Sequence, residues 1–330
     1  MTRLRALVDP FILMLLGTVA LASLLPARGS AVPLFATLAD IGIVLLFFLH
    51  GAKLSRAAIL AGARNWRLHL AVLATTFALF PLLGYGIGRL PGLDPVVAGG
   101  MLFLTLLPST VQSSIAFTAI ARGNVAAAVC SASFSNLLGI VVTPLLVALL
   151  MGGTTGGVSM TAVQAIATQL LLPFVAGHLL RPWIGDLVTR HKPLTTLVDR
   201  GSILLVVYSA FGAAVVEGLW HRLAPAEIGL IALLCCMLLA IVLLATWGAG
   251  RLLGFARADA IVLLFCGSKK SLAAGVPMAG VLFPAAQVGV VLLPLMLFHQ
   301  IQLIACAVIA RRYADQPVAA NGRDIPAMPR

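Results

Sequence analysis

Ten apolar stretches, each about as long as a helix that crosses a bilayer, constrain the fold of this 330-residue chain more than any other feature. Hydrophobic residues make up 61% of the chain and charged residues only 10%, whereas soluble domains carry about 25% charged residues. The sequence therefore predicts an all-α polytopic membrane protein. The ten predicted transmembrane helices cover residues 10–26, 34–51, 68–89, 94–121, 125–151, 160–181, 200–220, 226–250, 258–283 and 285–310.

The basic residues predict how these helices are oriented. If the amino terminus is cytoplasmic, 17 of the 22 Lys and Arg residues lie in cytoplasmic segments and only 3 lie on the opposite side. Cytoplasmic loops of membrane proteins carry such an excess. We therefore expect both termini in the cytoplasm, an uncleaved first span rather than a signal peptide, and a location in the plasma (inner) membrane. The net charge of +12 is explained by these loops and by anionic lipids, so nucleic acid is not an expected partner.

Two adjacent lysines interrupt the ninth predicted helix. A charge at the centre of a bilayer costs roughly 2.5–3.5 kcal/mol on insertion scales, and such residues usually face a cavity or a partner. Ser268, Lys269, Lys270 and Ser271 separate two apolar half-segments, neither of which spans the bilayer alone. This pattern predicts a discontinuous transmembrane helix. Because burial and like charge both disfavour two ammonium groups at once, coupling to protons is left open.

The order of the spans predicts an inverted repeat. A Gly- and Thr-rich linker at residues 152–157 divides the ten spans into five and five, and an odd number per half makes the halves enter the membrane from opposite sides. Span 4 has a polar break at residues 108–114, in the position that the break of span 9 has in the second half. We expect one transporter domain (1–312), made of repeats 1–151 and 158–312, and a disordered cytoplasmic tail (313–330).

The two breaks are the predicted binding site. A broken helix exposes backbone groups that protein, water or ligand must satisfy, and facing helix N-termini favour an anion. Interhelical hydrogen bonding is an alternative role for buried hydroxyl groups, and a lone intramembrane histidine is often a packing residue. The candidate residues from the breaks and from spans 5 and 10 are Ser109, Thr110, Gln112, Ser113, Ser114, Asn136, Ser268, Lys269, Lys270, Ser271 and His299.

Motifs of other protein classes are missing from the sequence. It contains no Walker A, H-E-x-x-H or G-x-S-x-G pattern and no cluster of Cys and His residues. We therefore expect no enzyme, no catalytic residue, no metal and no cofactor. Transport driven by ATP also lacks support.

The residues around the second break resemble the bile acid:sodium symporter superfamily, specifically its SBF-like branch. The resemblance rests on Phe265-Cys266-Gly267-Ser268-Lys269-Lys270-Ser271-Leu272, on Gly275-Val276-Pro277, and on Arg122-Gly123-Asn124-Val125-Ala126. It extends to about residue 312. It implies a ten-helix fold with a core domain (spans 3–5 and 8–10), a panel domain (spans 1, 2, 6 and 7), and spans 4 and 9 crossing at their unwound centres.

The resemblance also exposes departures from the symporters' sodium ligands. By this resemblance, the positions of their Glu, Gln and Asn in span 9 are occupied here by Phe265, Lys269 and Lys270. The positions of their Ser-Asn pair in span 4 are occupied by Ser113-Ser114. Their glutamine of span 3 looks like Thr76, which adds this residue to the candidates, and two hydroxyl ligands of span 5 fall near Ala128 and Ala132. A lysine ammonium can take the place of a bound cation. The resemblance with these departures therefore makes sodium coupling doubtful.

Together these features predict a secondary active transporter of a small organic anion that works by alternating access in the lipid bilayer. A cation/proton antiporter is one alternative. A non-transporting membrane regulator of ion homeostasis is another. The sequence sets neither the identity of the anion nor the oligomeric state.

Overall fold

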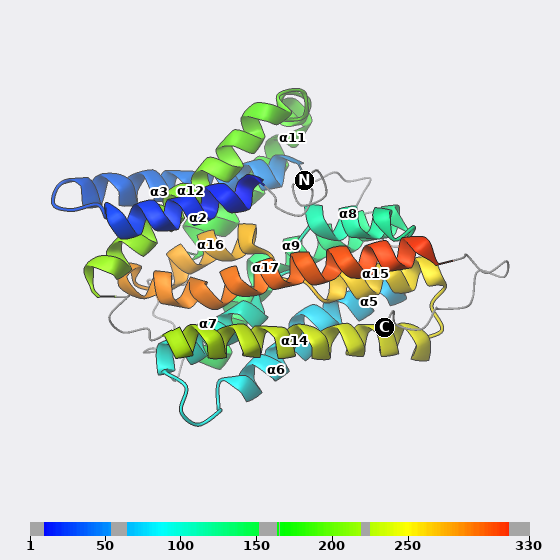
Figure 1. The fold of residues 1–330 in the computed structure, drawn as a ribbon. Coiled ribbons are helices and arrows are strands. Elements are labelled where there is room, and N and C mark those ends of the chain that lie inside the picture. The colour runs from blue at the N-terminus through cyan, green and yellow to red at the C-terminus, as the bar shows by residue number, and fades with distance from the viewer. Residues whose placement is uncertain (1–9, 54–64, 152–163, 165, 219–224, 317–330) are drawn as a thin grey trace. The chain divides into compact units, whose positions relative to one another are not determined.

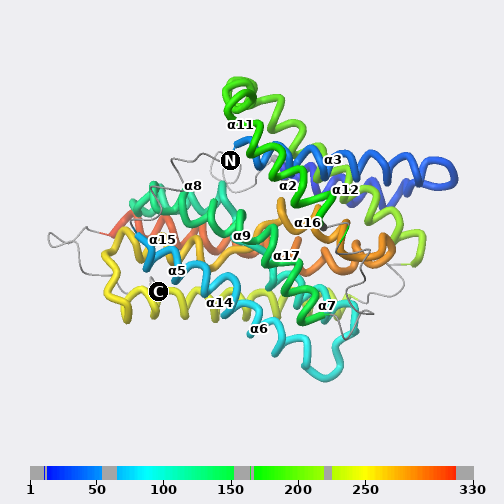
Figure 2. Tube along the Cα trace, turned by 180° about the vertical axis from the view of Figure 1, so that it is seen from behind, coloured from blue at the N-terminus to red at the C-terminus, as the bar shows by residue number. Residues whose placement is uncertain are grey.

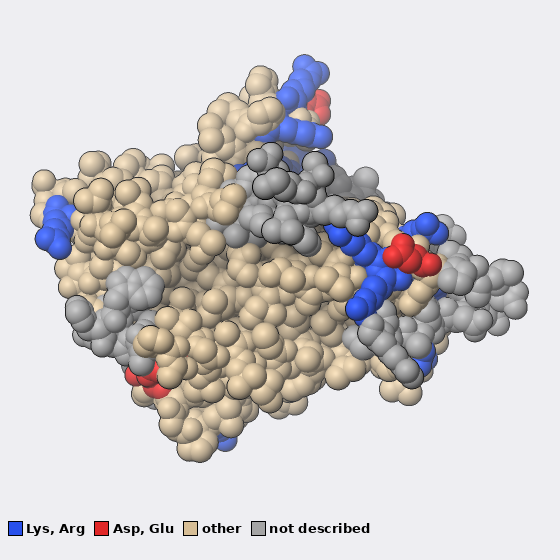
Figure 3. Space-filling model, in the orientation of Figure 1, with Lys and Arg blue, Asp and Glu red and all other residues tan. Residues whose placement is uncertain are grey.

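The computed structural model describes residues 10–53, 65–151, 164, 166–218 and 225–316, and these residues form helices and turns without a strand. Seven helices within these ranges are long and apolar enough to cross a membrane, and Leu13–Leu24 and Pro95–Leu106 are shorter apolar helices. Figure 3 shows broad stretches of the surface that carry no charged side chain. The chain is thus an integral multi-pass membrane protein, as its composition predicts.

The chain divides into two compact units, and each unit takes segments from both halves of the sequence. Unit 1 comprises Met1–Leu54, Met151–Ile228 and Gly275–Leu293, and unit 2 comprises Ser55–Leu150, Gly229–Ala274 and Pro294–Arg330. The ten-span inverted repeat stays a prediction, because the predicted span ends at residues 160 and 220 and the 152–157 linker lie outside the described residues.

Unit 1 is built around long helices that run side by side. Its main helices are α2 (Pro10–Leu24), α3 (Ala31–Lys53), the π-helical turn η3 (Ile166–Leu171), α11 (Leu172–Arg190) and α12 (Lys192–Val216). Figures 1 and 2 show α2, α3 and α12 next to one another, and α3 also packs against α11.

Glycines allow α3 and α11 to approach closely. A Cβ atom at Gly51 would overlap the carbonyl oxygen of Phe174, and a Cβ atom at Gly177 would overlap the carbonyl oxygen of Phe48. Small residues at helix contacts let backbones meet inside a membrane, where the hydrophobic effect does not drive association. The two glycines therefore set the distance between these helices.

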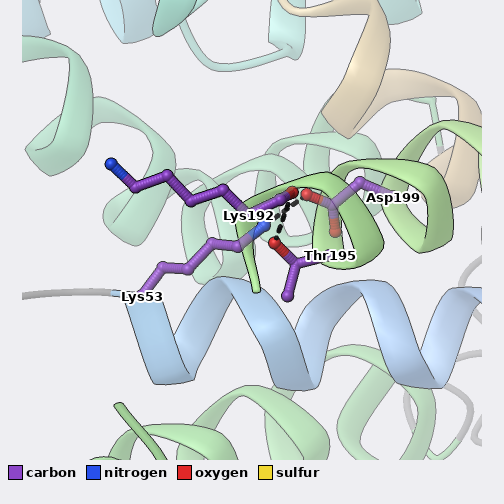
Figure 4. A network of polar contacts seen from close by, with 4 residues as sticks. All are labelled: Lys53, Lys192, Thr195 and Asp199. Atoms are coloured by element: carbon purple, nitrogen blue, oxygen red, sulfur yellow. Dashed lines mark hydrogen bonds and ion pairs between the residues drawn. The ribbon is translucent and has the colours of Figure 1, made fainter. Parts of the chain in front are cut away.

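A small polar network joins the end of α3 to the first turns of α12 (Figure 4). Lys53 Nζ lies 2.5 Å from Asp199 Oδ2, and Thr195 Oγ1 donates to the carbonyl oxygen of Lys192 at 3.1 Å. The amino group of Lys192 points away from Asp199 in Figure 4. Both partners of the ion pair are partly exposed, so the pair belongs to the rim of unit 1 rather than to its core.

Unit 2 contains most of the remaining helices. They are α5 (Trp66–Ala74), the π-helical turn η2 (Thr75–Leu79), α6 (Phe80–Ile87), α7 (Pro95–Leu106), α8 (Gln112–Ile120), α9 (Val125–Met151), α14 (Pro225–Leu252), α15 (Arg257–Gly267) and α17 (Ala285–Asp315). Helix α16 (Leu272–Leu282) begins in unit 2, but most of its residues belong to unit 1. The boundaries between the units fall within α14, α16 and α17 and at the last residue of α9.

Two interruptions separate α7 from α8 and α15 from α16. The second covers Ser268–Ser271, as the sequence predicts. The first covers Leu107–Val111, so the prediction that it runs to Ser114 is wrong, because Gln112, Ser113 and Ser114 form the first turn of α8. Leu107 is extended (φ −75°, ψ 156°), as expected of a residue that precedes a proline. Pro108 thus ends α7, and the polar residues after it begin a new helix.

The last helix is longer than predicted. It was expected to end at residue 310, but α17 continues to Asp315. Arg257 and Tyr313 are both buried, and the Arg257 guanidinium donates to the Tyr313 carbonyl oxygen at 2.7 Å. This bond ties the end of α17 to the start of α15. The predicted tail lies almost entirely outside the described residues, which end at 316.

Candidate functional site

The two interruptions lie against each other inside unit 2. Ser109 Oγ donates to the Cys266 carbonyl oxygen at 2.6 Å, at the end of α15. In return, the backbone N–H of Ser271 donates to the Pro108 carbonyl oxygen at 2.9 Å. Each interruption therefore satisfies backbone groups that the other leaves without a helical partner, which a membrane interior requires.

Helix α9 holds Ser109 in place from a third direction. The Ser109 N–H donates to Ser135 Oγ at 2.9 Å, and Asn136 Nδ2 donates to the Ser109 carbonyl oxygen at 2.7 Å. The sequence marked Asn136 as a candidate ligand. The structure places it close to the interruption, where its amide supports the backbone.

The end of the first interruption and the first turn of α8 together carry a chain of hydroxyl groups. Ser113 Oγ donates to Thr110 Oγ1 at 3.0 Å, and Thr110 Oγ1 lies 3.1 Å from Ser114 Oγ. Ser114 Oγ donates to the Phe265 carbonyl oxygen at 3.1 Å. Gln112, in the same turn, is exposed. The structure thus brings Thr110, Ser113 and Ser114 together and leaves Gln112 apart from them.

Lys270 is fully buried, and backbone oxygens surround its ammonium group. Its Nζ donates to the carbonyl oxygens of Thr76 at 2.8 Å, Thr105 at 2.8 Å and Leu107 at 2.7 Å. It also lies 4.1 Å from the centre of the Phe80 ring. An ammonium group has three donors, so every proton of this group has a partner.

The backbone of Lys270 is held by a glutamine that the candidate list missed. Gln302 Oε1 accepts from the Lys270 N–H, and Gln302 Nε2 donates to the Lys270 carbonyl oxygen, both at 2.9 Å. Gln302 Nε2 also lies 2.9 Å from His299 Nδ1. The sequence analysis chose His299 as the candidate in this helix. In the structure, the fully buried Gln302 is the residue that bonds the backbone of the second interruption. His299 and Gln302 are three residues apart and so share one helix face, and this spacing could have identified Gln302 from the sequence.

Lys269 is also fully buried, but its ammonium group has no hydrogen-bond partner among the described residues. Its Nζ faces two aromatic rings, with their centres at 4.3 Å for Phe117 and 5.4 Å for Phe265. A desolvated cation–π contact stabilises by about 2 kcal/mol, less than the several kcal/mol that burying an ion costs. In its charged form, Lys269 therefore lacks full compensation among the described residues.

The two serines that flank the lysines bond within their own segments. Ser268 Oγ donates to the Leu264 carbonyl oxygen at 2.5 Å, one turn back in α15. Ser271 Oγ accepts from the Ala274 N–H at 3.2 Å, which caps the start of α16. Both hydroxyl groups thus stabilise helix ends.

Thr76 contributes its carbonyl group rather than its side chain. Its hydroxyl group donates to the Val72 carbonyl oxygen at 2.8 Å within its own helix. Thr76 lies in the π-helical turn η2, where the Phe80 N–H bonds the Thr75 carbonyl oxygen. The next bond in this pattern would join residue 81 to Thr76, but Pro81 has no N–H. The carbonyl oxygen of Thr76 is therefore available to Lys270.

The positions that resemble the symporters' sodium ligands carry few side-chain oxygens. Phe265, Ala128 and Ala132 are buried and apolar. Among the described residues, no group of three or more His, Cys, Asp or Glu side chains could hold a metal ion. The site has instead a pair of buried lysine amino groups: that of Lys270 is fully hydrogen-bonded, and that of Lys269 has no hydrogen-bond partner among the described residues.

Comparison with known proteins places these features in a family. The family description "SBF-like CPA transporter family" matches residues 9–315. The chain is 57% identical over 320 residues to "Uncharacterized protein PA2026" of Pseudomonas aeruginosa and 54% identical over 316 residues to "Putative symporter YfeH" of Escherichia coli, with 95% of each chain covered in both cases. It is 25% identical to "Sodium/bile acid cotransporter 7" of Xenopus tropicalis, over 91% of this chain and 90% of that protein.

Proposed function

The chain belongs to the SBF-like CPA transporter family, and on this premise we propose that it is a secondary active transporter of a small organic anion. The proposed substrate carries a carboxylate, sulfate or phosphate group. Its site lies beside the two interruptions of unit 2.

The observation that carries this proposal is the ammonium group of Lys269. It is fully buried and has no hydrogen-bond partner among the described residues. An anionic group would supply the missing compensation, since a buried charge is stable only when it is paired and hydrogen-bonded. The start of α8 supports this choice, because Val111 provides no side-chain cap for the free N–H groups of the first turn, and helix N-termini attract anions.

We further propose the architecture that the sequence predicts. It has ten transmembrane helices in two inverted repeats, both termini in the cytoplasm and a location in the plasma (inner) membrane. Unit 2 contains most of the predicted core and unit 1 most of the predicted panel, which supports this division. Transport would then proceed by alternating access, with one unit moving against the other.

We propose that transport does not require sodium. The apolar side chains of Phe265, Ala128 and Ala132 support this, because sodium sites are built from oxygen ligands. The transport cycle would be coupled to protons or would proceed without a coupling ion.

A cation/proton antiporter is the second candidate. The predicted two-domain architecture with crossed helices offers an analogy to such antiporters. Against it, residues 107–111 and 268–271, which form the two interruptions, include no acidic residue that could exchange a cation for protons. A non-transporting regulator is the third candidate, and it would show no flux of either kind.

A thermal unfolding screen of the purified protein tests the proposal. The probes are cholate, succinate and simple organic sulfates and phosphates, each with sodium and with sodium replaced by choline. We expect at least one anion to raise the Tm equally in both media, and the effect to vanish in Lys269→Ala. Lys53→Ala is the matched control, because it removes a basic residue of unit 1 and should keep the effect.

Uptake by proteoliposomes separates the candidates. The stabilising anion should enter wild-type vesicles and not vesicles that contain Lys269→Ala. Uptake that needs sodium would contradict the proposal. Proton release on addition of Na⁺, K⁺ or Ca²⁺ without an anion would favour the antiporter, and the absence of both fluxes would favour the regulator.

A further inference from the structure

The side chain of Lys270 ends in a cage of three backbone carbonyl oxygens, those of Thr76, Thr105 and Leu107, which we call the carbonyl cage. The three oxygens lie 2.7–2.8 Å from Nζ. They come from the π-helical turn η2 and from the end of α7. No carboxylate takes part in these three bonds, so the hydrogen bonds of the ammonium group are made to carbonyl dipoles.

Covalent structure and neighbouring contacts explain why these oxygens are available. Pro81 cannot donate to the Thr76 oxygen. The regular donor for the Thr105 oxygen would be the Ser109 N–H, but that group donates to Ser135 Oγ. Leu107 is extended and lies beyond the last residue of α7. The carbonyl cage therefore arises from the backbone itself and does not depend on the lysine side chain for its oxygens.

Such a cage has the composition of a monovalent cation site. Carbonyl oxygens in proteins replace the hydration shell of K⁺, and an ammonium ion bonds the same oxygens at the usual N–H···O distance of about 2.9 Å. The face of the Phe80 ring, 4.1 Å from Nζ, adds a further favourable contact for a cation.

We propose that the carbonyl cage is a monovalent cation site that this chain fills with its own lysine, and that it binds ammonium, K⁺ or Na⁺ from solution when the side chain is shortened. Ammonium binds best, since it reproduces the hydrogen bonds of Nζ. Lys270 is then a positioning residue: its tethered charge joins η2, the end of α7 and the second interruption. This inference concerns a different ligand from the proposed anion and does not depend on it.

Thermal unfolding of Lys270→Ala tests the proposal. The purified variant is titrated with ammonium, potassium or sodium chloride against N-methylglucamine chloride at constant ionic strength. We expect a low Tm in N-methylglucamine and a saturable rise of about 5 °C with ammonium, as binding to the folded state alone requires. Wild type and Lys269→Ala, the matched control at the adjacent lysine, should not respond.

Two further variants at the same position sharpen the result. Lys270→Met fills the space of the lysine stem without a charge, so it should be destabilised and should respond weakly to cations. Lys270→Asn leaves the carbonyl cage open and adds an amide, so it should respond as Lys270→Ala does. If Lys270→Ala does not fold in N-methylglucamine, recovery of folded protein in ammonium supports the proposal.

Three results would overturn it. The first is a folded Lys270→Ala whose Tm is the same in all four salts. The second is a response of equal size in wild type, Lys269→Ala or Lys270→Met, which would show a general salt effect. The third is failure of both Lys270→Ala and Lys270→Asn to fold with any of the cations.

Discussion

The contact between α3 and α11 in unit 1 and the contact between the two interruptions in unit 2 bring helices together in different ways. In the first, uninterrupted helices meet at Gly51 and Gly177, where a Cβ atom would overlap the backbone of the opposite helix. In the second, α7 and α15 end, and side chains such as Ser109 bond the carbonyl groups set free. The first contact depends on shape, the second on hydrogen bonds.

This difference indicates where function can reside. A regular helix satisfies its own backbone, so the α3–α11 contact releases no backbone group to a ligand. An interruption releases N–H and C=O groups that must find partners, and it can hold charges that lipid would exclude. The two lysines illustrate this. The carbonyl groups released by the interruption bind the ammonium group of Lys270, whereas the amino group of Lys269 faces aromatic rings.

The largest effect is expected from the shape-dependent contact. Gly177→Ala places a methyl group on the carbonyl oxygen of Phe48, and the two helices must separate. We expect a loss of about 3 kcal/mol in the free energy of unfolding, which a reduced Tm would reveal. Gly201→Ala in α12 is the control, since a Cβ atom there has no neighbour within 4 Å. Equal stability of the two variants would show that α3 and α11 are not in close contact.

A smaller effect is expected at the interruption. Gln302→Leu removes both hydrogen bonds to the Lys270 backbone and leaves a buried N–H and a buried C=O without partners. The expected loss is about 2 kcal/mol, together with faster hydrogen exchange of the Lys270 amide. Gln300→Leu, two residues earlier and only partly buried, should change neither quantity by much. A stable Gln302→Leu with a protected amide would contradict the backbone role of Gln302.

The smallest effect is expected from the ion pair at the rim of unit 1. Asp199→Asn removes the charge that faces Lys53, where both side chains are partly exposed. Water screens such a pair, so we expect a loss below about 1 kcal/mol, and less in high salt. Lys192→Gln should have no effect, because the Lys192 side chain points away from Asp199 in Figure 4. A large loss that persists in high salt would show that the pair supports the fold.

The sequence predicted the parts of the site that depend on local chemistry. The interruption at Ser268–Ser271 follows from polar residues between apolar segments, and the structure has it there. The first interruption was predicted too long, because a proline ends a helix at the preceding residue while nothing prevents a new helix from starting at Gln112. The polar character of residues 112–114 suggested a break, but their backbone is helical.

The sequence could not predict which polar atoms meet. Thr76 was selected for its side chain, but its carbonyl oxygen makes the contact, since Pro81 lacks the N–H that would occupy it. His299 was a candidate and Gln302, three residues later in the same predicted span, was not. The backbone N–H and C=O of Lys270 both bond the side-chain amide of Gln302, because an amide can donate and accept at the same time.

By itself, the sequence determined that the chain resides in a membrane and that two of its helices are interrupted, because hydropathy, charge and proline act through neighbouring residues. It could not distinguish Lys269 from Lys270, which are adjacent and have the same polar surroundings along the chain. Only the tertiary structure decided that the ammonium group of Lys270 is fully bonded, while that of Lys269 has no such partner in the part of the chain that the structure describes. The reason is that the carbonyl groups that bind Lys270 lie between 163 and 194 residues away in the sequence, and folding alone brings them within 2.8 Å.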